Sequence, residues 1–166
     1  TIDTSGSKLK IVDSQRVVDP SLTWSPALYA DSGNLAIPER YESIYWNTWG
    51  CWGDLLTTYI DDLYKHYKYR EMPVEEMRAK AKAGMPASLC RLDTVSMTVC
   101  DRYLFPRGVF DNSPQFMPRM TTGEKTSEKD ATTSTDGYLA CVVLLTQPDG
   151  MPDSQIWIFD AQHLAQ

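Results

Sequence analysis

The clearest periodic pattern along the chain lies between Asp54 and about Tyr69. Apolar and aromatic side chains recur there at intervals of three and four, at Leu55, Leu56, Tyr59, Ile60, Leu63, Tyr64 and Tyr67. This spacing is typical of one face of an α-helix. We therefore predict a helix with Asp54 as its N-cap, and we expect the face with Leu56, Tyr59, Ile60 and Leu63 to be buried.

A second helix is predicted between Pro73 and Gly84. Proline suits the first turn of a helix, where its missing N–H is not needed, and Glu75 and Glu76 follow it near the positive end of the helix dipole. Glycine is a common residue at the end of a helix. The short turn between the two helices predicts an αα-hairpin over about residues 54–83.

The period changes to two after the helices. Val95, Met97 and Val99 alternate with polar residues, which predicts a strand that continues to Phe105. Residues 138–147 form a continuous apolar run, and residues 155–160 follow a turn rich in Pro and Gly, so we expect an antiparallel hairpin there. Short strands are also predicted from β-branched pairs between residues 8 and 18.

Three stretches lack periodicity. Residues 1–7 are polar and are expected to form a flexible arm, and residues 19–40 combine prolines with apolar side chains, which favours a long ordered loop. Residues 121–136 are rich in Thr, Ser, Glu and Lys. Such a segment offers little apolar surface to offset its ordering entropy, so we expect a mobile surface loop.

These elements favour an α+β fold. The order is strands, loop, αα-hairpin, strand, loop and strand pair, which suits a mainly antiparallel sheet with the helices packed on one side. The chain has 166 residues, of which 42% are hydrophobic. This length and composition predict a single domain over residues 1–166.

The charge balance argues against a nucleic-acid partner. Sixteen Lys and Arg residues face 22 Asp and Glu residues, a net charge of −6. Binding of nucleic acid through its phosphates needs a basic surface, so this mode is disfavoured. No apolar run approaches the roughly 18–20 residues of a membrane span, and no leader sequence is evident at the amino end, so we expect a soluble protein of unassigned compartment.

Four cysteines lie at Cys51, Cys90, Cys100 and Cys141, with no CxxC pair among them. This spacing does not match a structural zinc site. We expect mostly buried, reduced thiols, which behave as small hydrophobic residues. Two disulfides in a secreted binding module are the alternative.

The most distinctive stretch is aromatic. Tyr45, Trp46, Trp49 and Trp52 lie within eight residues, just before the first predicted helix. Core packing explains such a cluster most simply. The alternatives are an anchor at a subunit interface and a platform for a ligand, because Trp and Tyr are favoured where one end of a site is apolar and the other is polar.

Candidates for catalysis are few. His66 lies four residues after Asp62 on the predicted helix, so the two could share a hydrogen bond, as a catalytic base and its orienting carboxylate do. An exposed ion pair has the same spacing. No GxxxxGK[ST], GxGxxG or GxSxG motif occurs, and no metal-binding spacing is present, so we predict no cofactor and no metal.

Function is predicted mainly from composition. The chain is rich in aromatic residues, Pro and Thr, and it contains only two His. With its long loops, it resembles small viral coat or capsid-protrusion proteins in composition and in its loop-rich β layout. We therefore expect a non-enzymatic structural or assembly protein that associates with itself or with other subunits. The alternative is a small hydrolase or ligand-binding enzyme with a cleft near Trp46, Trp49 and Trp52.

Overall fold

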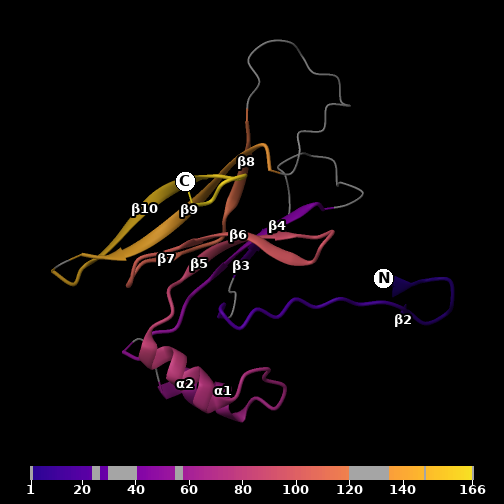
Figure 1. Ribbon diagram of the computed structural model, residues 1–166, viewed down its shortest axis with the longest axis horizontal. Coiled ribbons are helices and arrows are strands. Elements are labelled where there is room, and N and C mark those ends of the chain that lie inside the picture. Colours follow the sequence, from indigo (N-terminus) through magenta and orange to yellow (C-terminus); the bar gives the residue numbers. More distant parts are fainter. Residues whose placement is uncertain are drawn as a thin grey trace.

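The computed structural model describes residues 2–23, 27–29, 41–54, 58–119, 135–147 and 149–165. Within these ranges the strands are β1 (Ile2–Asp3), β2 (Lys10–Ile11), β3 (Ala27–Tyr29), β4 (Ser43–Thr48), β5 (Ser88–Asp93), β6 (Thr98–Leu104), β7 (Phe110–Asp111), β8 (Gln115–Pro118), β9 (Gly137–Thr146) and β10 (Pro152–Asp160). The helices are α1 (Thr58–His66) and α2 (Val74–Ala83). Figure 1 shows their arrangement.

The strands form two antiparallel sheets and a separate ribbon. One sheet has the order β3-β4-β5-β6. In the other, β9 pairs with β10 along one edge and with β7 and β8 along the opposite edge. The ribbon consists of β1 and β2. A mixed, sheet-rich α+β fold with antiparallel sheets is therefore confirmed.

The main core lies between the two sheets. It combines side chains from β4, β5, β8, β9 and β10 with Phe105, Ala161 and Leu164 from the segments that follow β6 and β10. Four aromatic rings meet within it: those of Tyr103, Phe105, Trp157 and Phe159. Burial of such large rings from both sheets holds the layers together.

The predicted hairpin of the last two strands is confirmed, and β9 shows which of its faces is buried. Leu139, Cys141 and Val143 are fully buried, whereas Val142 and Leu144, which alternate with them along the strand, are exposed. Side chains alternate along a strand, so only one face of β9 meets the core. A continuous apolar run does not reveal this difference, because both faces of the strand carry the same kind of residue.

The strand predicted from Val95 onward begins later in the structure. Residues 94–97 form the turn between β5 and β6, and the Asp93 carboxylate accepts hydrogen bonds from the backbone N–H groups of Val95 and Ser96, at 2.9 and 2.7 Å. This Asp-centred turn replaces the predicted strand conformation. β1, β3, β4, β5, β7 and β8 were not predicted; β1 lies in the predicted arm and β3 in the loop predicted over residues 19–40. Between residues 8 and 18, where short strands were predicted, only β2 is a strand.

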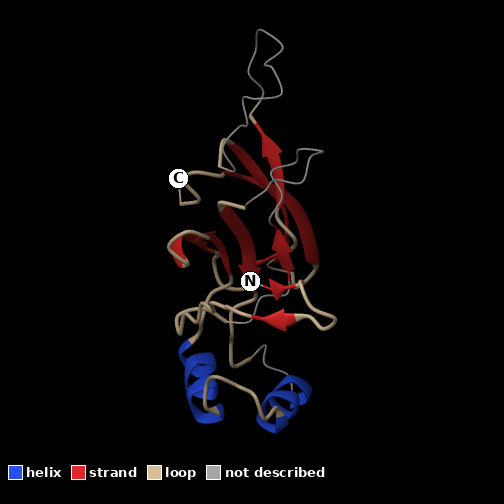
Figure 2. Cartoon of the chain, turned by 90° about the vertical axis from the view of Figure 1, so that its right-hand side faces the viewer, coloured by secondary structure: helices blue, strands red, loops and turns tan. Residues whose placement is uncertain are grey.

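The two helices lie beyond one end of the sheets (Figures 1 and 2). α2 follows the prediction: Pro73 precedes it, and the N–H of Gly84 closes its last turn on the carbonyls of Lys80 and Ala81. Its residues Val74, Met77 and Ala81 are buried with Cys51 in a second, smaller core.

The predicted burial of α1 is wrong. Tyr59 is 71% exposed and Leu63 is 58% exposed, and Ile60 is half-buried. Leu56 lies outside the described residues. The helices stand beyond one end of the sheets, where Tyr59 and Leu63 remain exposed, and Tyr64 of α1 packs against the second core.

Two other predictions concern loops. Most of the predicted mobile loop, residues 121–134, lies outside the described residues, as do residues 24–26 and 30–40 of the predicted ordered loop. Residues 2–7 of the predicted arm are described, and they are exposed. No described helix is long and apolar enough to cross a membrane.

Candidate functional site

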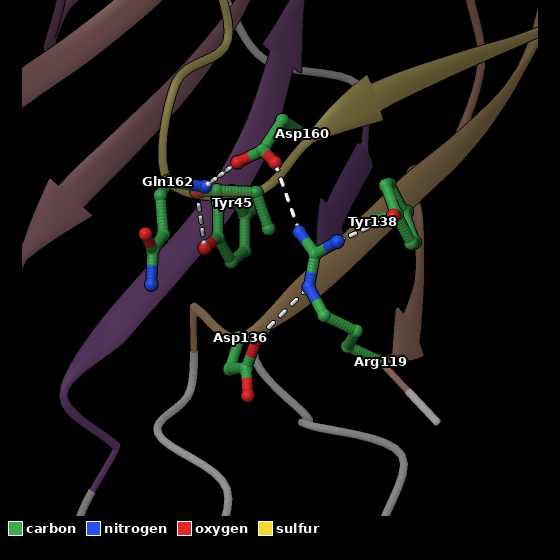
Figure 3. Close-up of polar contacts among 7 residues, drawn as sticks. Tyr45, Arg119, Asp136, Tyr138, Asp160 and Gln162 are labelled. Carbon is green, nitrogen blue, oxygen red and sulfur yellow. Dashed lines mark hydrogen bonds and ion pairs between the residues drawn. The ribbon is translucent and has the colours of Figure 1, made fainter. Parts of the chain in front are cut away.

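The structure separates the members of the aromatic cluster. Tyr45 and Trp46 are neighbours on β4, so their side chains point to opposite faces of the sheet. Tyr45 lies in the main core, where its ring stacks on Phe116 with 6.4 Å between centroids, and its hydroxyl donates to the carbonyl of Ala161 at 2.9 Å (Figure 3). Because Tyr45 is buried, it serves in core packing and cannot be part of a surface platform for a ligand.

The two later tryptophans take different positions. Trp49 is exposed. Trp52 is half-buried, with the guanidinium carbon of Arg107 5.0 Å from the centre of its ring. Gly84 lies against the same ring: a Cβ atom there would come within 2.1 Å of it. Trp52 therefore packs beside the end of α2, away from Trp46.

A cleft of about 600 Å³ lies beside Trp46. It is bounded by residues 17–23, by α2 and by the turn between the helices, and its apolar wall includes Val18, Leu22, Trp46, Tyr64, Met72 and Met77. Small-molecule sites are usually concave, mainly apolar, and between about 300 and 1,000 Å³. The cleft has the size and lining of such a site, and it contains one of the predicted tryptophans.

Residues 17–23 are held over the cleft by polar contacts. Lys80 of α2 donates to the carbonyl of Pro20 at 2.8 Å, and Arg102 of β6 donates to the hydroxyl of Ser21 at 2.7 Å. The Ser21 hydroxyl and backbone N–H also bond to the carboxylate of Asp19 and lower its pKa. These contacts from different elements make residues 17–23 a strap across the cleft.

The charged groups around the cleft have partners within the described structure. Glu71 pairs with Arg16, and Glu76 lies 3.8 Å from Lys80. The guanidinium of Arg70 donates to the carbonyls of Lys65 and Tyr67, at 3.2 and 2.9 Å. These charges at the rim are paired with other protein groups. The lining that the cleft offers to a ligand is therefore mainly apolar and aromatic.

Thr48, Ser88 and Cys90 form a buried chain of hydroxyls and a thiol in the first sheet. The hydroxyls of Thr48 and Ser88 are 2.7 Å apart, and the Ser88 hydroxyl is 3.4 Å from the Cys90 sulfur. Burial raises the pKa of Cys90 to about 11. A thiol with so high a pKa stays protonated near neutral pH and is a poor nucleophile.

The predicted catalytic pair lies elsewhere. His66 and Asp62 are both exposed on α1, and neither lines the cleft. Asp62 pairs with Lys65, and no hydrogen bond joins Asp62 to His66 among the described residues. His66 borders a shallow hollow of about 560 Å³ with Ile60, Leu63 and Tyr64 of α1 and with Tyr67, which follows the helix. Asp62 lines a different hollow, of about 770 Å³, together with Trp52 and Arg78. The two members of the pair therefore border different hollows.

A buried polar pair joins the two sheets, and no sequence pattern pointed to it. Asn47 of β4 donates its side-chain N–H to the backbone carbonyl of Asp111 of β7 at 2.8 Å. Asp111 is 2% exposed, and neither of its carboxylate oxygens has a hydrogen-bond partner among the described residues; the same is true of Asn47 Oδ1. Burial raises the pKa of Asp111 to about 7, against a smaller lowering effect of the Asn47 amide.

A charged cluster ties the end of β8 to the last hairpin. The guanidinium of Arg119 contacts Asp136 at 3.2 Å, Asp160 at 3.1 Å and the hydroxyl of Tyr138 at 2.5 Å (Figure 3). Asp160 also accepts a hydrogen bond from the backbone N–H of Gln162, which is the main reason for its lowered pKa. The cluster is internally paired, so its role is to hold these strands together.

Metal and disulfide chemistry have little basis in the described structure. No group of three or more His, Cys, Asp or Glu side chains among the described residues could hold a metal ion. All four cysteines, which are all described, are free thiols, and Cys100 is the exposed one. This gives no support to the alternative of a disulfide-containing binding module.

In comparisons with known proteins, no family model, no curated protein and no solved structure matches the chain.

Proposed function

We propose that this chain is a non-enzymatic structural or assembly subunit that acts through protein–protein contacts. The observation that carries this proposal is the outer face of β9 and β10. On that face Val142 and Ile156 are cross-strand partners, and Leu144 and Ile158 lie beside them. Ile156 is 71% exposed and Ile158 is 54% exposed.

The composition of this face is unusual for a surface that meets only water. Its central positions, from Ala140 to Leu144 on β9 and from Ser154 to Ile158 on β10, hold no charged side chain. Monomeric soluble proteins rarely expose contiguous apolar patches larger than a few hundred Å², and larger patches usually mark contacts with a partner. Burial against another subunit would remove this apolar area from water.

A second contact surface on α1 follows from the same proposal. In it, α1 and α2 act as a helical hairpin that presents Tyr59 and Leu63 to a partner. Arg78 of α2 pairs with Asp61 of α1 at 2.6 Å, and Tyr64 donates to the carbonyl of Met72 at 2.9 Å. These contacts favour a hairpin that keeps its shape while its apolar face stays available. A coat or capsid-protrusion subunit is one form that such a protein takes.

The test is the solution mass of the chain and of one matched pair of variants. We expect the wild type to exceed the monomer mass of 18.8 kDa at concentrations of about 100 µM, which corresponds to a modest interface. Ile156→Lys should return the mass to that of a monomer. Val95→Lys, which places the same charge on an exposed residue of the turn between β5 and β6, should leave it unchanged. A wild type that stays monomeric contradicts the proposal.

A second candidate function is the binding of an uncharged, largely apolar small molecule in the cleft beside Trp46. The volume and aromatic lining of the cleft favour this function. The charged residues Arg70, Glu71 and Glu76 at its rim all have partners within the described structure, which suits an uncharged ligand. Trp46 provides its own reporter, because a ligand in contact with an indole changes its fluorescence. Saturable fluorescence quenching in the wild type that is lost in Trp46→Phe would support binding. If any turnover of a bound molecule is detected and persists in His66→Ala, His66 is not a catalytic residue.

A further inference from the structure

The amino-terminal segment leaves its apolar side chains uncovered. Every described residue from 2 to 16 is exposed, including Ile2, Leu9, Ile11 and Val12. The only regular structure there is the ribbon of β1 with β2, two residues on each strand. A two-stranded ribbon alone is marginally stable in water, and it gains stability when it joins a larger sheet.

The strand β10 offers an edge for such pairing. Within the described structure β10 pairs with β9 alone, so the backbone N–H and C=O groups of its other side have no strand partner. An unpaired edge is a template for an added strand. One face of β10 at this edge carries Ile156 and Ile158. The opposite face carries Asp153 and Gln155 near the turn and, further along the strand, Trp157 and Phe159, which pack in the main core.

The sequence of the segment matches both faces of that edge. In Lys8-Leu9-Lys10-Ile11, basic and apolar residues alternate. As a strand beside β10, Leu9 and Ile11 would continue the apolar face, and Lys8 and Lys10 would fall on the side of Asp153. Whether the added strand runs parallel or antiparallel to β10, its apolar and basic side chains stay on opposite faces of the sheet, because neighbouring side chains alternate along a strand.

Charge favours the same pairing. Residues 2–16 contain three basic and two acidic side chains, whereas the whole chain has a net charge of −6. The segment is therefore basic relative to the rest of the protein. The edge strand of the other sheet, β6, carries both Asp101 and Arg102, so its charges balance, whereas β10 carries Asp153 and Asp160 and no basic residue. Of these two edges, β10 is the one with complementary charge and an apolar face.

We propose that residues 8–12 of one copy of this chain add as a strand to β10 of a second copy. The pairing is between molecules, because the ribbon of β1 and β2 lies on the opposite side of the protein from β10 (Figure 1). This inference rests on the proposed assembly function and names the segments that meet. It extends the sheet of β9 and β10 by one strand and adds Leu9 and Ile11 to the apolar face beside Ile156 and Ile158.

Charge reversal tests the pairing by sedimentation. Lys8→Glu with Lys10→Glu should weaken self-association at least about tenfold in Kd. Asp153→Lys alone should weaken it too, and the combination of all three changes should restore most of the affinity. Lys68→Glu, in the turn between the helices, combined with Lys82→Glu, on α2, is the matched control and should have little effect. None of these five side chains is buried in the core, so the fold should persist in each variant.

A pair of introduced cysteines tests whether residue 9 of one copy lies beside β10 of another copy. In a Cys100→Ser background, which removes the exposed native thiol, we would mix a tagged Leu9→Cys chain with an untagged Ile156→Cys chain under mild oxidation. A disulfide-linked dimer with one chain of each kind is expected. Failure to form it would overturn the pairing of residue 9 with β10.

The outcomes separate this inference from the proposed function. If the wild type associates but neither lysine reversal nor Asp153→Lys weakens it, the strand addition is wrong and assembly through another surface stands. Loss of association in the lysine variant without rescue by Asp153→Lys also overturns the pairing with β10. A wild type that never associates overturns both.

Discussion

The buried carboxyl of Asp111 should make the stability of this protein fall as the pH rises through neutrality. Its folded pKa is about 7, raised mainly by burial. In the unfolded chain an aspartate has a pKa of about 3.9. Because the folded pKa is the higher one, the folded state disfavours the charged form, and the associated stability is present at low pH and is lost between these two values.

The size of the effect follows from the difference between the two pKa values. About three pKa units correspond to roughly 4 kcal/mol at pH values above 7. Some of this loss has already occurred at pH 5, so linkage predicts a further loss of about 3 kcal/mol between pH 5 and pH 8.5. The cost has a structural origin: ionised Asp111 carries its charge on two buried oxygens that have no hydrogen-bond partner among the described residues.

The perturbation is Asp111→Asn, which keeps the shape and removes the titration. Urea denaturation followed by tryptophan fluorescence at pH 5 and pH 8.5 would give the free energy of unfolding of both proteins. We expect the wild type to lose about 3 kcal/mol more than the variant over this range. Subtracting the pH dependence of the variant's unfolding free energy from that of the wild type removes the contribution of every other titrating group. Asp160→Asn is the control, because the pKa of Asp160 is lowered and it should leave the slope in this range unchanged.

An equal pH dependence in wild type and Asp111→Asn would refute this reasoning. It would mean that Asp111 is hydrated or partnered in solution, and that the contact between β4 and β7 is looser than the structure indicates. A slope of the opposite sign would be equally incompatible with a raised pKa.

Three further predictions concern packing and exposure. Leu139→Ala should cost about 2–5 kcal/mol in denaturation, because the side chain is fully buried, whereas Leu63→Ala should cost less than about 1 kcal/mol. Gly84→Ala should destabilise by at least about 1 kcal/mol, since a Cβ meets the Trp52 ring at 2.1 Å and the backbone φ is +84°; unchanged thermal stability would contradict this. Cys100 should react first with a thiol reagent in the native protein, as judged by mass spectrometry of the modified peptide.

The elements predicted best from the sequence are those with local signals. α2 is marked by Pro73, two glutamates and Gly84, and the hairpin of β9 and β10 is marked by apolar runs around a turn. Such signals depend on neighbours in the chain, so they can be recognised without knowing the fold.

The errors arose where distant parts of the chain decide the outcome. The apolar face of α1 predicts burial, yet whether it is buried depends on where the helix stands relative to the sheets. The aromatic cluster was considered as one unit, whereas strand alternation on β4 sends Tyr45 into the core and Trp46 to the cleft.

The candidate site was partly accessible from the sequence. Trp46 could be identified as a residue of interest, but the strap of residues 17–23 that completes its cleft is separated from it by more than twenty residues. The pair of Asn47 and Asp111 spans 64 positions and belongs to two different sheets. Isolated polar residues of this kind have no periodic signature, so only the tertiary structure identifies them as buried.

If another subunit covers the exposed apolar face of β9 and β10, a charge at Ile156 should abolish self-association. Sedimentation velocity of the wild type and of Ile156→Lys, over a concentration series reaching about 100 µM, measures this. We expect the wild-type mass to rise above 18.8 kDa with concentration while the variant remains a cooperatively folded monomer. A wild type that stays at 18.8 kDa throughout the series, with a mass identical to that of the variant, would contradict it.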